Sequence, residues 1–458
     1  MARKKKEDKI VSIDLNQSNI ELSRAVGEIT RDAYIFYGGY VNNFRAICGL
    51  DGLKISYRRL IYTAMGFPKG RLNPSLTLIS SISQFHPHGV QSLDGVNSTL
   101  VKSGIFKGRG FFGSTSMSLY SPTGKVVSDP AASRYLQSGL SDLYWELLGD
   151  TIKEVDFVPS PQEKMEPTYI PLPIPVALFM STQIEGLGVG TRVKYPTFEI
   201  KSLYEAYKND NPLLLKSKSD FLIDYENSEL QRLWETGKGK VIYSYKISRQ
   251  LSPDGKTEGI LFETKDGTDM FTPNFKKFKK LVDEGKVYGE DLSDADGEKY
   301  FIGRVPGARG ITIDDIENIA RKCCYDDTTY SLMVTDGKSC FRIPLRDWIK
   351  FTYERYIGLV TKVNQKKIDK TTFDIAVLEA IPLISDYILN KNPKATDEEI
   401  MRVFGMPQEI VSSVMSKPIS YLRKNKDTSD RIKELKTRLK ELKKFDPVVY
   451  TEQIINQL

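Results

Sequence analysis

The chain has two histidines among its 458 residues, and both stand in the tetrapeptide His86-Pro87-His88-Gly89. An imidazole can donate a hydrogen bond to a phosphate oxygen, shuttle a proton or bind a metal ion. A closed zinc site needs about four ligands, and neither a Cys-x-x-Cys pair nor a further histidine supplies them. We therefore expect phosphate or proton chemistry at this turn and no metal site.

A second candidate is the pair Arg134-Tyr135. A tyrosine phenol has a pKa near ~10, so it is a poor nucleophile unless its developing charge is stabilised. An adjacent guanidinium could stabilise charge on a phosphorus-centred transition state. Since the chain has 24 tyrosines, spacing alone does not single out Tyr135.

Positive charge is concentrated around these residues, although the whole chain carries only +7. The segment from Arg45 to Tyr135 holds three acidic residues, Asp51, Asp94 and Asp129, and the remainder of the chain is about neutral. A local positive field on a neutral body favours a polyanionic partner. The eleven basic residues of the segment are Arg45, Lys54, Arg58, Arg59, Lys69, Arg71, Lys102, Lys107, Arg109, Lys125 and Arg134.

Two glycine-rich stretches differ in what they indicate. The run from Lys107 to Ser114 mixes glycine, cations and aromatics, which suits a loop that approaches phosphates. The run from Gly186 to Gly190 lacks a following Lys-Ser or Lys-Thr, so it is not a phosphate-binding loop of the Walker type. No ATP-binding motif occurs, and Asp294-Ala-Asp296 lies in a polar stretch that does not predict a Mg²⁺ site.

The spacing of apolar residues and the positions of glycine and proline predict the elements that must position these residues. A polar arm over 1–30 is expected to be helical. Helices are also predicted over 57–65 and over 131–149, where Leu136, Leu140, Leu143 and Leu147 form an apolar stripe. The other expectations are loops or short strands over 104–125, an extended connector over 159–175, strands over 238–272 with a turn at 266–267, a mixed segment over 313–347, a long helix over 347–390 and two short helices over 396–416.

The C-terminal segment 431–445 places Ile432, Leu435, Leu439 and Leu442 at alternating spacings of three and four. This is a two-heptad seam. It fits a coiled coil at a dimer interface, and it equally fits an amphipathic helix packed on its own domain.

The composition is that of an ordinary globular protein, with 40% hydrophobic and 27% charged residues. Four cysteines are too few for a disulfide scaffold and indicate reduced thiols. No apolar run reaches the ~20 residues of a membrane-spanning helix, and the charged N-terminus is no secretory leader. We expect a cytoplasmic protein, in the host cytoplasm if it is viral, with no membrane contact.

Taken in order, the motifs resemble the breakage–reunion core of type IIA DNA topoisomerases, and most nearly the medium subunit of the T-even-phage type. The resemblance also extends to gyrase A and topoisomerase IV A. The stretches that carry it are DGLKISYRRLIYTAM (51–65), HPHG (86–89), GFFGS (110–114), AASRY (131–135), IPLPIPVALFMSTQIEGLGVGTRVKYP (170–196) and GKGKVIYSYKI from 237 on.

The resemblance implies a role for each matching residue. Tyr135 matches the tyrosine that attacks a DNA phosphodiester, and Arg134 matches its arginine partner. Arg45 and His88 match positions beside the scissile phosphate. Leu187 matches an apolar wedge between bases, which permits a sharper bend. The remaining implied DNA contacts are Lys54, Arg58, Arg59, His86, Lys107 and Arg109.

The chain departs from the family pattern at several points. Val90 follows HPHG where the family has Asp, and KGRGFFGS replaces DGQGNFGS. Ile55 replaces a proline, Tyr57 replaces a histidine, and the segment between GFFGS and AASRY is longer than usual. These differences bear on the details of the DNA site.

The implied fold is α+β and multidomain. It comprises an arm (1–30), a winged-helix DNA-cleavage domain (31–158), a tower domain (159–345), and a helical coiled coil ending in a dimer gate (346–458). The implied function is DNA cleavage and rejoining in an ATP-dependent type II topoisomerase that relaxes and decatenates DNA. Double-stranded DNA and a second copy of the chain are the expected partners, together with an ATPase subunit that holds Mg²⁺ and ATP.

Two other functions remain compatible with the residues. A relaxase of the His-hydrophobic-His type also pairs histidines with a nucleophilic tyrosine, although Pro87 fits a central strand poorly. A non-catalytic DNA-binding scaffold would account for the departures at 90 and 107–111. Replacing Tyr135 by phenylalanine distinguishes an enzyme from such a scaffold.

Overall fold

The structure is a computed structural model. Side chains of the first helix are described from Val26 onward. The backbone is described for residues 15–87, 89, 92–121, 124–218, 221–225, 229–265, 275–294, 297–323, 325–326, 328–418 and 428–458.

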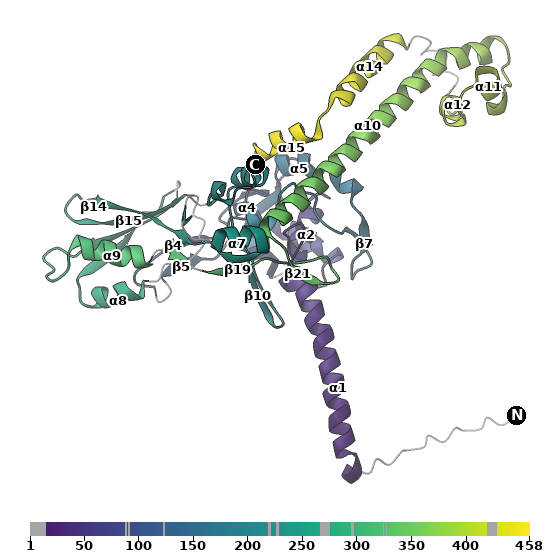
Figure 1. Ribbon diagram of the computed structural model, residues 1–458. Helices are drawn as coiled ribbons and strands as arrows, with labels where there is room; N and C mark the ends of the chain where they lie inside the picture. Colours follow the sequence, from purple (N-terminus) through teal and green to yellow (C-terminus); the bar gives the residue numbers. More distant parts are fainter. Residues whose placement is uncertain are drawn as a thin grey trace.

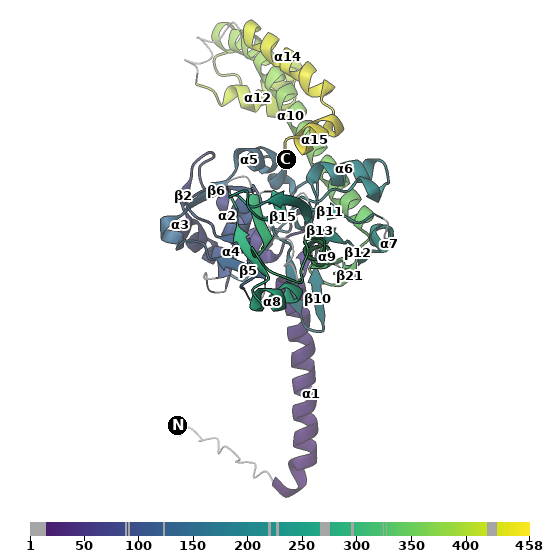
Figure 2. The same ribbon diagram turned by 90° about the vertical axis from the view of Figure 1, so that its left-hand side faces the viewer.

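A central body carries three extensions (Figure 1). Helix α1 (Leu15–Val41) protrudes from one end, and an arm built on helix α10 (Leu345–Asn390) leaves the other. A lobe with its own sheet extends to the left in Figure 1 and faces the viewer in Figure 2. The described fold is mixed α+β with several small sheets, in agreement with the expected class.

The N-terminal half of the body is built from short helices around small sheets. In α2 the residues Leu60, Ile61 and Ala64 are buried, which confirms the predicted helix and its apolar face. Its elements are η1 (Asn42–Ala46, one π-helical turn), β1 (Cys48–Gly49), α2 (Ile55–Ala64), β2 (Asn73–Pro74), α3 (Ser75–Ser81), η2 (Ile82–Gln84), α4 (Leu93–Lys102), β3 (Phe106–Arg109), β4 (Ser114–Met117), β5 (Lys125–Ser128), η4 (Ser133–Tyr135), β6 (Gln137–Leu140), α5 (Asp142–Leu148) and η5 (Thr151–Glu154).

The predicted helix over 131–149 is wrong in its first half. Residues 137–140 form strand β6, which is central in the sheet β2-β6-β3, and only 142–148 are helical. Gly139 explains the difference, because a Cβ there would lie 2.8 Å from the carbonyl oxygen of Arg71. The chain therefore passes through this narrow space as an extended strand, and pairing with two neighbours overrides the helical spacing of the leucines.

The second half of the body contributes pairs of short strands and two helices. The proline-rich segment 159–175 contains no helix, as predicted, and β1 pairs in parallel with β20, so distant parts of the chain close one core. Its elements are β7 (Phe157–Pro159), β8 (Met165–Pro167), η6 (Val176–Leu178), β9 (Glu185–Gly188), β10 (Thr191–Lys194), α6 (Ile200–Lys208), η7 (Pro212–Leu214), β11 (Leu222–Ile223), α7 (Glu229–Thr236), β12 (Lys238–Lys240), β13 (Tyr243–Ser244), β18 (Tyr325–Asp326), β19 (Thr329–Ser331), β20 (Met333–Thr335) and β21 (Cys340–Arg342).

The lobe is a four-stranded antiparallel sheet of order β14-β15-β17-β16, flanked by two helices. This confirms the strands predicted over 238–265, whereas the predicted turn at 266–267 lies outside the described residues. The elements are β14 (Lys246–Leu251), β15 (Glu258–Lys265), α8 (Lys276–Asp283), β16 (Val287–Asp291), β17 (Gly297–Arg304) and α9 (Ile313–Cys323).

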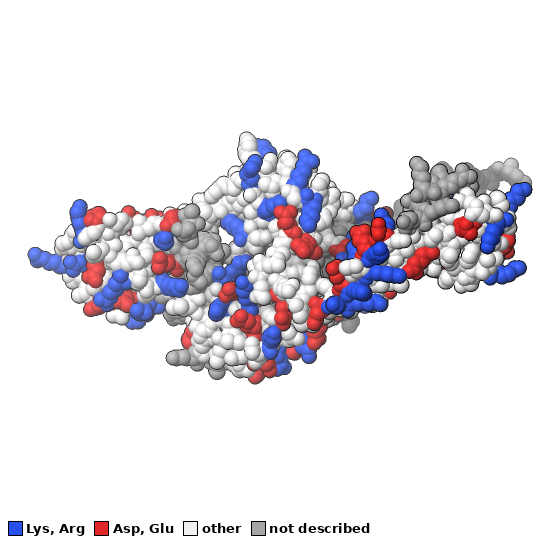
Figure 3. All heavy atoms as spheres, turned by 90° about the horizontal axis from the view of Figure 1, so that it is seen from above, with Lys and Arg blue, Asp and Glu red and all other residues white. Residues whose placement is uncertain are grey.

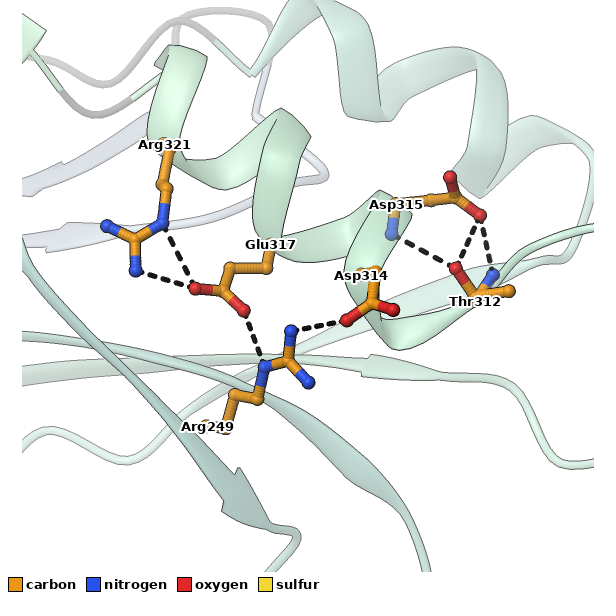
Figure 4. A network of polar contacts seen from close by, with 6 residues as sticks. All are labelled: Arg249, Thr312, Asp314, Asp315, Glu317 and Arg321. Atoms are coloured by element: carbon orange, nitrogen blue, oxygen red, sulfur yellow. Dashed lines mark hydrogen bonds and ion pairs between the residues drawn. The ribbon is translucent and has the colours of Figure 1, made fainter.

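Helix α9 is held on this sheet by ion pairs and begins with a capping box (Figure 4). Arg249 on β14 donates to carboxylates of Asp314 and Glu317. The Thr312 amide donates to Asp315 Oδ2 at 2.8 Å, and the Asp315 amide donates back to Thr312 Oγ at 3.2 Å. Reciprocal bonds of this kind satisfy amides that a helix start otherwise leaves unpaired.

The long segment between GFFGS and AASRY includes the hairpin β4–β5, whose connection reaches the lobe. The amide of Leu119 donates to Tyr300 Oη at 2.8 Å, and the amide of Gly289 donates to Tyr120 Oη at 3.3 Å. The added residues therefore tie the segment before Tyr135 to strands β16 and β17.

The arm confirms the long helix and the two short ones that follow it. Helices α11 (Asp397–Phe404) and α12 (Gln408–Met415) pack on the end of α10 around a separate apolar core. Helix α14 (Ser429–Lys444) runs back along α10, and α15 (Pro447–Ile455) returns the C-terminus to the body. Lys and Arg are intermixed with Asp and Glu on the face seen in Figure 3.

The heptad seam packs within the chain. Ile432, Leu435, Leu439 and Leu442 are the four residues of α14 that are not fully exposed. The Lys436 ammonium lies 2.7 Å from Glu379 Oε1, and Asn364 donates to the carbonyl of Leu442 at 3.0 Å. Because 379 and 364 both belong to α10, the two helices are antiparallel partners. The seam is therefore an amphipathic helix packed on its own domain, the second of the two expectations, and the dimer gate expected within 346–458 stays a prediction.

The expected domain boundaries, including the winged-helix and tower assignments, stay predictions. No helix within the described ranges is long and apolar enough to cross a membrane.

Candidate active site

Tyr135 is presented to solvent at the start of the central strand β6. It is the last residue of the short 3₁₀ helix η4, and 70% of its surface is exposed. Its amide donates to the carbonyl of Ala132 at 2.8 Å, which fixes the turn. The guanidinium carbon of Arg134 lies 4.7 Å from the centre of the phenol ring. An accessible phenol thus stands beside a cation, as the sequence predicts.

The glycine-rich loop 108–113 holds the segment that carries Tyr135. The amide of Ala131 donates to the carbonyl of Phe111 at 3.0 Å. Gly110 has φ +114°, and a Cβ there would lie 2.6 Å from a methyl carbon of Leu136. The loop therefore needs glycine at this position to lie close to the tyrosine segment.

Leu187 projects from the hairpin β9–β10 with 76% of its surface exposed. The glycines on either side permit the hairpin to lie directly on η1, because a Cβ on Gly186 would lie 1.9 Å from the Ala46 carbonyl oxygen. Asn42 clamps the turn: its side chain accepts from the Val189 amide at 2.9 Å and donates to the Val189 carbonyl at 3.2 Å. A large exposed apolar side chain is thus held on a rigid support.

Arg45 is exposed on the π-helical turn η1, against which that hairpin packs. Its guanidinium carbon lies 5.2 Å from the ring centre of Tyr40. In Figures 1 and 2 the hairpin β9–β10 lies beside the base of α1. Arg45 and Leu187 therefore belong to one surface formed by α1, η1 and the hairpin.

Arg59 and His86 lie inside the protein and contact each other. Arg59 is 6% exposed, and its guanidinium makes two bonds to the Glu166 carboxylate, at 2.7 and 2.8 Å. Its third nitrogen lies 3.1 Å from His86 Nδ1. The predicted DNA contact of each residue stays a prediction, and both side chains already have buried partners. His88, the other predicted histidine, lies outside the described residues.

Arg58 is likewise engaged within the chain. Its guanidinium makes two bonds to Asp51, at 2.9 and 3.0 Å, and the Asp51 carboxylate also accepts from the amides of Leu53 and Ile170. Burial raises the pKa of the nearby Cys48 thiol to about 12, so this cysteine is an inert core residue at neutral pH. Lys54 donates to the carbonyl of Glu185 on the hairpin.

The side chains of Lys107 and Arg109 lie in different surroundings, although both residues belong to β3. The Lys107 ammonium lies 3.1 Å from the Asp142 carboxylate and donates to the Gly70 carbonyl at 3.0 Å. Arg109 is exposed and is paired in register with Gln137, two residues after Tyr135. Of the two, Arg109 lies at the end of β3 nearer the tyrosine.

Among the residues that the structure describes, no group of three or more His, Cys, Asp or Glu side chains could hold a metal ion. The expectation that a partner chain holds Mg²⁺ stays a prediction.

Three residues that support the site were not selected from the sequence: Asn42, Asp51 and Glu166. Their partners lie seven or more positions away, and for Asn42 and Glu166 more than 100 positions away. No local pattern indicates such pairs. Asp51 alone had a possible signal, since it opens the DGLK motif.

Comparison with known proteins points to one family. Residues 45–265 match the family model that describes the A subunit of DNA gyrase/topoisomerase IV. Over these residues, the chain is similar to the A subunits of type IIA topoisomerases. The match includes Tyr135, Arg134, Arg45 and Leu187.

Three curated relatives agree with this similarity. The A subunit of DNA topoisomerase 4 from Staphylococcus aureus is 23% identical over 87% of this chain and 52% of its own length. The corresponding Streptococcus pneumoniae protein is 25% identical over 62% of this chain and 36% of its own length. The A subunit of DNA gyrase from Mycoplasma pneumoniae is 30% identical over 54% of this chain and 31% of its own length.

The chain thus spans about a third to a half of the length of these curated type IIA relatives. The nearer resemblance to a phage-type medium subunit stays a prediction.

Proposed function

We propose that this chain is the DNA cleavage-and-rejoining subunit of an ATP-dependent type II DNA topoisomerase. The observation that carries the proposal is the exposed Tyr135 beside Arg134, within the segment that matches the family. The matched segment also contains a projecting apolar residue, Leu187, on a supported hairpin.

The proposed reaction is a transesterification. The Tyr135 oxygen attacks a backbone phosphorus, a P–O bond to tyrosine forms, and the P–O3′ bond breaks. The phenol proton is lost, the 3′ oxygen gains a proton, and the 5′ end stays attached to the protein. Since one phosphodiester is exchanged for another, rejoining is the reverse reaction and needs no high-energy cofactor. Arg134 would stabilise charge on the phosphorus as the phenol attacks.

Exposed residues of the matched segment suit a bent duplex. Leu187 would enter a base step, since an apolar wedge unstacks bases and lowers the cost of a sharp bend. Arg45 and Arg109 are exposed and would neutralise phosphates. Arg58 and Arg59 are paired with carboxylates, so we assign them to holding the surface in shape.

A partner chain would supply ATP hydrolysis and Mg²⁺, which neutralises developing charge in phosphoryl transfer. Helix α1 is the surface we assign to that partner. It protrudes from the body and exposes a series of large apolar side chains, of which Phe36 is 81% exposed. Exposed apolar surface of this extent marks an interaction site. The residues are Val26, Ile29, Tyr34, Ile35, Phe36 and Tyr37.

Cutting both strands requires two tyrosines and hence a two-fold dimer. We place one contact between copies at the far end of the arm. There Leu383 and Val403 are exposed beside the separate core of α11 and α12. The α14 seam is not available for this contact, because it packs on α10.

The test is covalent trapping on plasmid DNA. The full chain is combined with its ATPase partner and Mg²⁺, quenched with detergent, and scored for protein-linked DNA. Tyr135→Phe should abolish the covalent complex while DNA binding persists. Tyr120→Phe is the matched control, since Tyr120 is also exposed; the variant loses only the bond from the Gly289 amide and keeps the Tyr135 phenol, so it should trap DNA as the wild type does.

Two outcomes would contradict the proposal. Undiminished trapping by Tyr135→Phe would assign the chemistry to another residue, as a relaxase with a different tyrosine would. No trapping by the wild-type chain, with the partner's ATPase shown to be active, would leave a DNA-binding scaffold.

A further inference from the structure

Glu166 lies on strand β8 in the body and belongs to none of the motif stretches. Its carboxylate is 9% exposed and faces Arg59 on helix α2. We propose that Glu166 is a positioning residue that, through Arg59, holds the His86 ring with its proton on Nε2. The proposal rests on the proposed function only for its effect on cleavage.

The geometry fixes the plane and the direction of the Arg59 guanidinium. Arg59 Nε lies 2.7 Å from Glu166 Oε2, and a terminal nitrogen lies 2.8 Å from Oε1. Two parallel bonds of this kind are the strongest and most directional that an arginine forms with a carboxylate. The remaining nitrogen is then aimed at His86 Nδ1, at 3.1 Å.

The chemistry of the two groups decides the direction of that last bond. An arginine has five N–H donors, no acceptor, and no accessible neutral form. His86 Nδ1 must therefore accept, so the single ring proton of the neutral imidazole resides on Nε2. A ring protonated on both nitrogens would direct an N–H at the Arg59 N–H. The main chain adds a further constraint, because the His86 amide donates to the Ile82 carbonyl at 2.9 Å.

The carboxylate compensates the charge of the buried guanidinium. Both the Arg59 and Glu166 side chains are less than a tenth exposed. Removing one charge of a buried pair leaves the other without compensation. Neutralising Glu166 should therefore release the guanidinium from its fixed direction, and with it the preference of the His86 ring for one tautomer. In that fixed form the ring carries its proton on Nε2 and can donate from that atom.

The ring can be observed directly, because the chain has only two histidines. Full-length protein labelled with ¹⁵N-histidine gives one set of ring signals for each, and His88→Gln assigns them. Long-range ¹H–¹⁵N spectra distinguish the two tautomers. In the wild type we expect at least nine tenths of His86 as the Nε2–H form. In Glu166→Gln we expect a mixture.

A matched control separates this effect from loss of a buried carboxylate in general. Glu154 is 8% exposed at its side chain and pairs with Lys362 and Lys366 at the base of the arm. Glu154→Gln should leave the His86 signals unchanged. Arg59→Lys is the second variant, since an ammonium keeps the charge but cannot make all three bonds, and it should also give a mixture.

Activity supplies the second readout. At saturating DNA, Glu166→Gln should slow formation of the covalent complex by the factor by which the Nε2–H population of His86 falls, since the effect acts through that tautomer. Its DNA affinity should change less than twofold, because the carboxylate is buried. Glu154→Gln should match the wild type in both measurements.

The outcomes are distinct from those that test the proposed function. A wild-type His86 ring with its proton on Nδ1 would overturn the inference, as would an unchanged ring in Glu166→Gln and Arg59→Lys. A changed ring with an unchanged cleavage rate would overturn the positioning role. If the wild-type chain forms no covalent complex at all, the proposed function fails, and the tautomer measurement still decides whether Glu166 orients His86.

Discussion

The region that exposes Tyr135 and Leu187, which we propose to cleave DNA and call the cleavage region, differs from the arm in how its elements are built. In the cleavage region, elements of two to ten residues expose Tyr135 and Leu187 on supports that glycines bring within contact distance. In the arm, a 46-residue helix spans the distance from the body to a separate small core. The cleavage region fixes the positions of individual side chains. The arm fixes the distance between the body and the small core at its end.

The difference predicts what a substitution should do in each region. In the cleavage region a single added methyl group should displace functional residues. In the arm a much larger deletion should change stability and leave the chemistry at Tyr135 intact.

The largest effect is expected for Gly186→Ala. The new Cβ would lie 1.9 Å from the Ala46 carbonyl oxygen, so the hairpin must separate from η1. We expect the free energy of unfolding to fall by about 3 kcal/mol, as overpacking of a backbone contact does. DNA bending measured by energy transfer should be lost together with cleavage. Gly39→Ala on α1 meets no atom within 4 Å and serves as control; an equal loss there would refute the argument.

The next effect tests the arm. Leu439→Ala removes a half-buried side chain from the α14 seam. Because the site is only partly buried, we expect a loss of about 1 to 2 kcal/mol, below the range for fully buried leucines. Denaturant unfolding measures this loss, and Lys440→Ala, its exposed neighbour, should cost little. Covalent trapping at Tyr135 should be unchanged at temperatures where the arm is folded. A loss of trapping there would show that the two regions are coupled.

A smaller and pH-dependent effect is expected where the arm returns to the body. Tyr204 donates to Glu452 Oε1 at 2.5 Å and Lys208 does so at 3.0 Å, and these bonds hold the pKa of Glu452 below its usual value. A carboxyl group whose pKa is lowered by folding contributes stability at pH values above its unfolded pKa of ~4.3. That contribution is lost as the pH falls from the unfolded pKa through the folded pKa. Glu452→Gln should cost about 1 kcal/mol at pH 7. The variant should also lose part of the acid sensitivity of unfolding; identical pH profiles would contradict this.

The smallest effect concerns Lys107, which the sequence assigns to DNA and the structure pairs with Asp142. Both side chains are substantially exposed, so Asp142→Asn should change stability by less than about 0.5 kcal/mol. Releasing the ammonium should raise DNA affinity slightly. Lys107→Ala should lower the salt dependence of binding by about one unit of slope. An unchanged slope would remove Lys107 from the DNA contacts.

Sequence reasoning succeeded in different ways in the two regions. The long helix α10 and the four seam leucine and isoleucine positions follow from periodicity, which is a local property of the chain. The partner of the seam does not, since the same heptad fits a second copy or the adjacent α10. The exposure of Tyr135 and Leu187 agrees with the motifs that select them, although their roles stay predictions.

Long-range pairing explains what the sequence could not predict. Residues 136–140 have leucines at helical spacing, yet strands β2 and β3 on either side make 137–140 a strand. Arg59 is a predicted DNA contact because the family resemblance implies it, and nothing in the local sequence indicates a buried partner. Its partner Glu166 lies 107 residues further along the chain, and only the folded structure brings them together.

The central claim is that Tyr135 becomes covalently attached to DNA. The most direct measurement is mass spectrometry of nuclease- and protease-digested covalent complexes, formed by the full chain with its ATPase partner. The account predicts a nucleotide-bearing peptide that contains Arg134-Tyr135, with the adduct on the tyrosine. An adduct on any of the other 23 tyrosines, or on a serine, would contradict it.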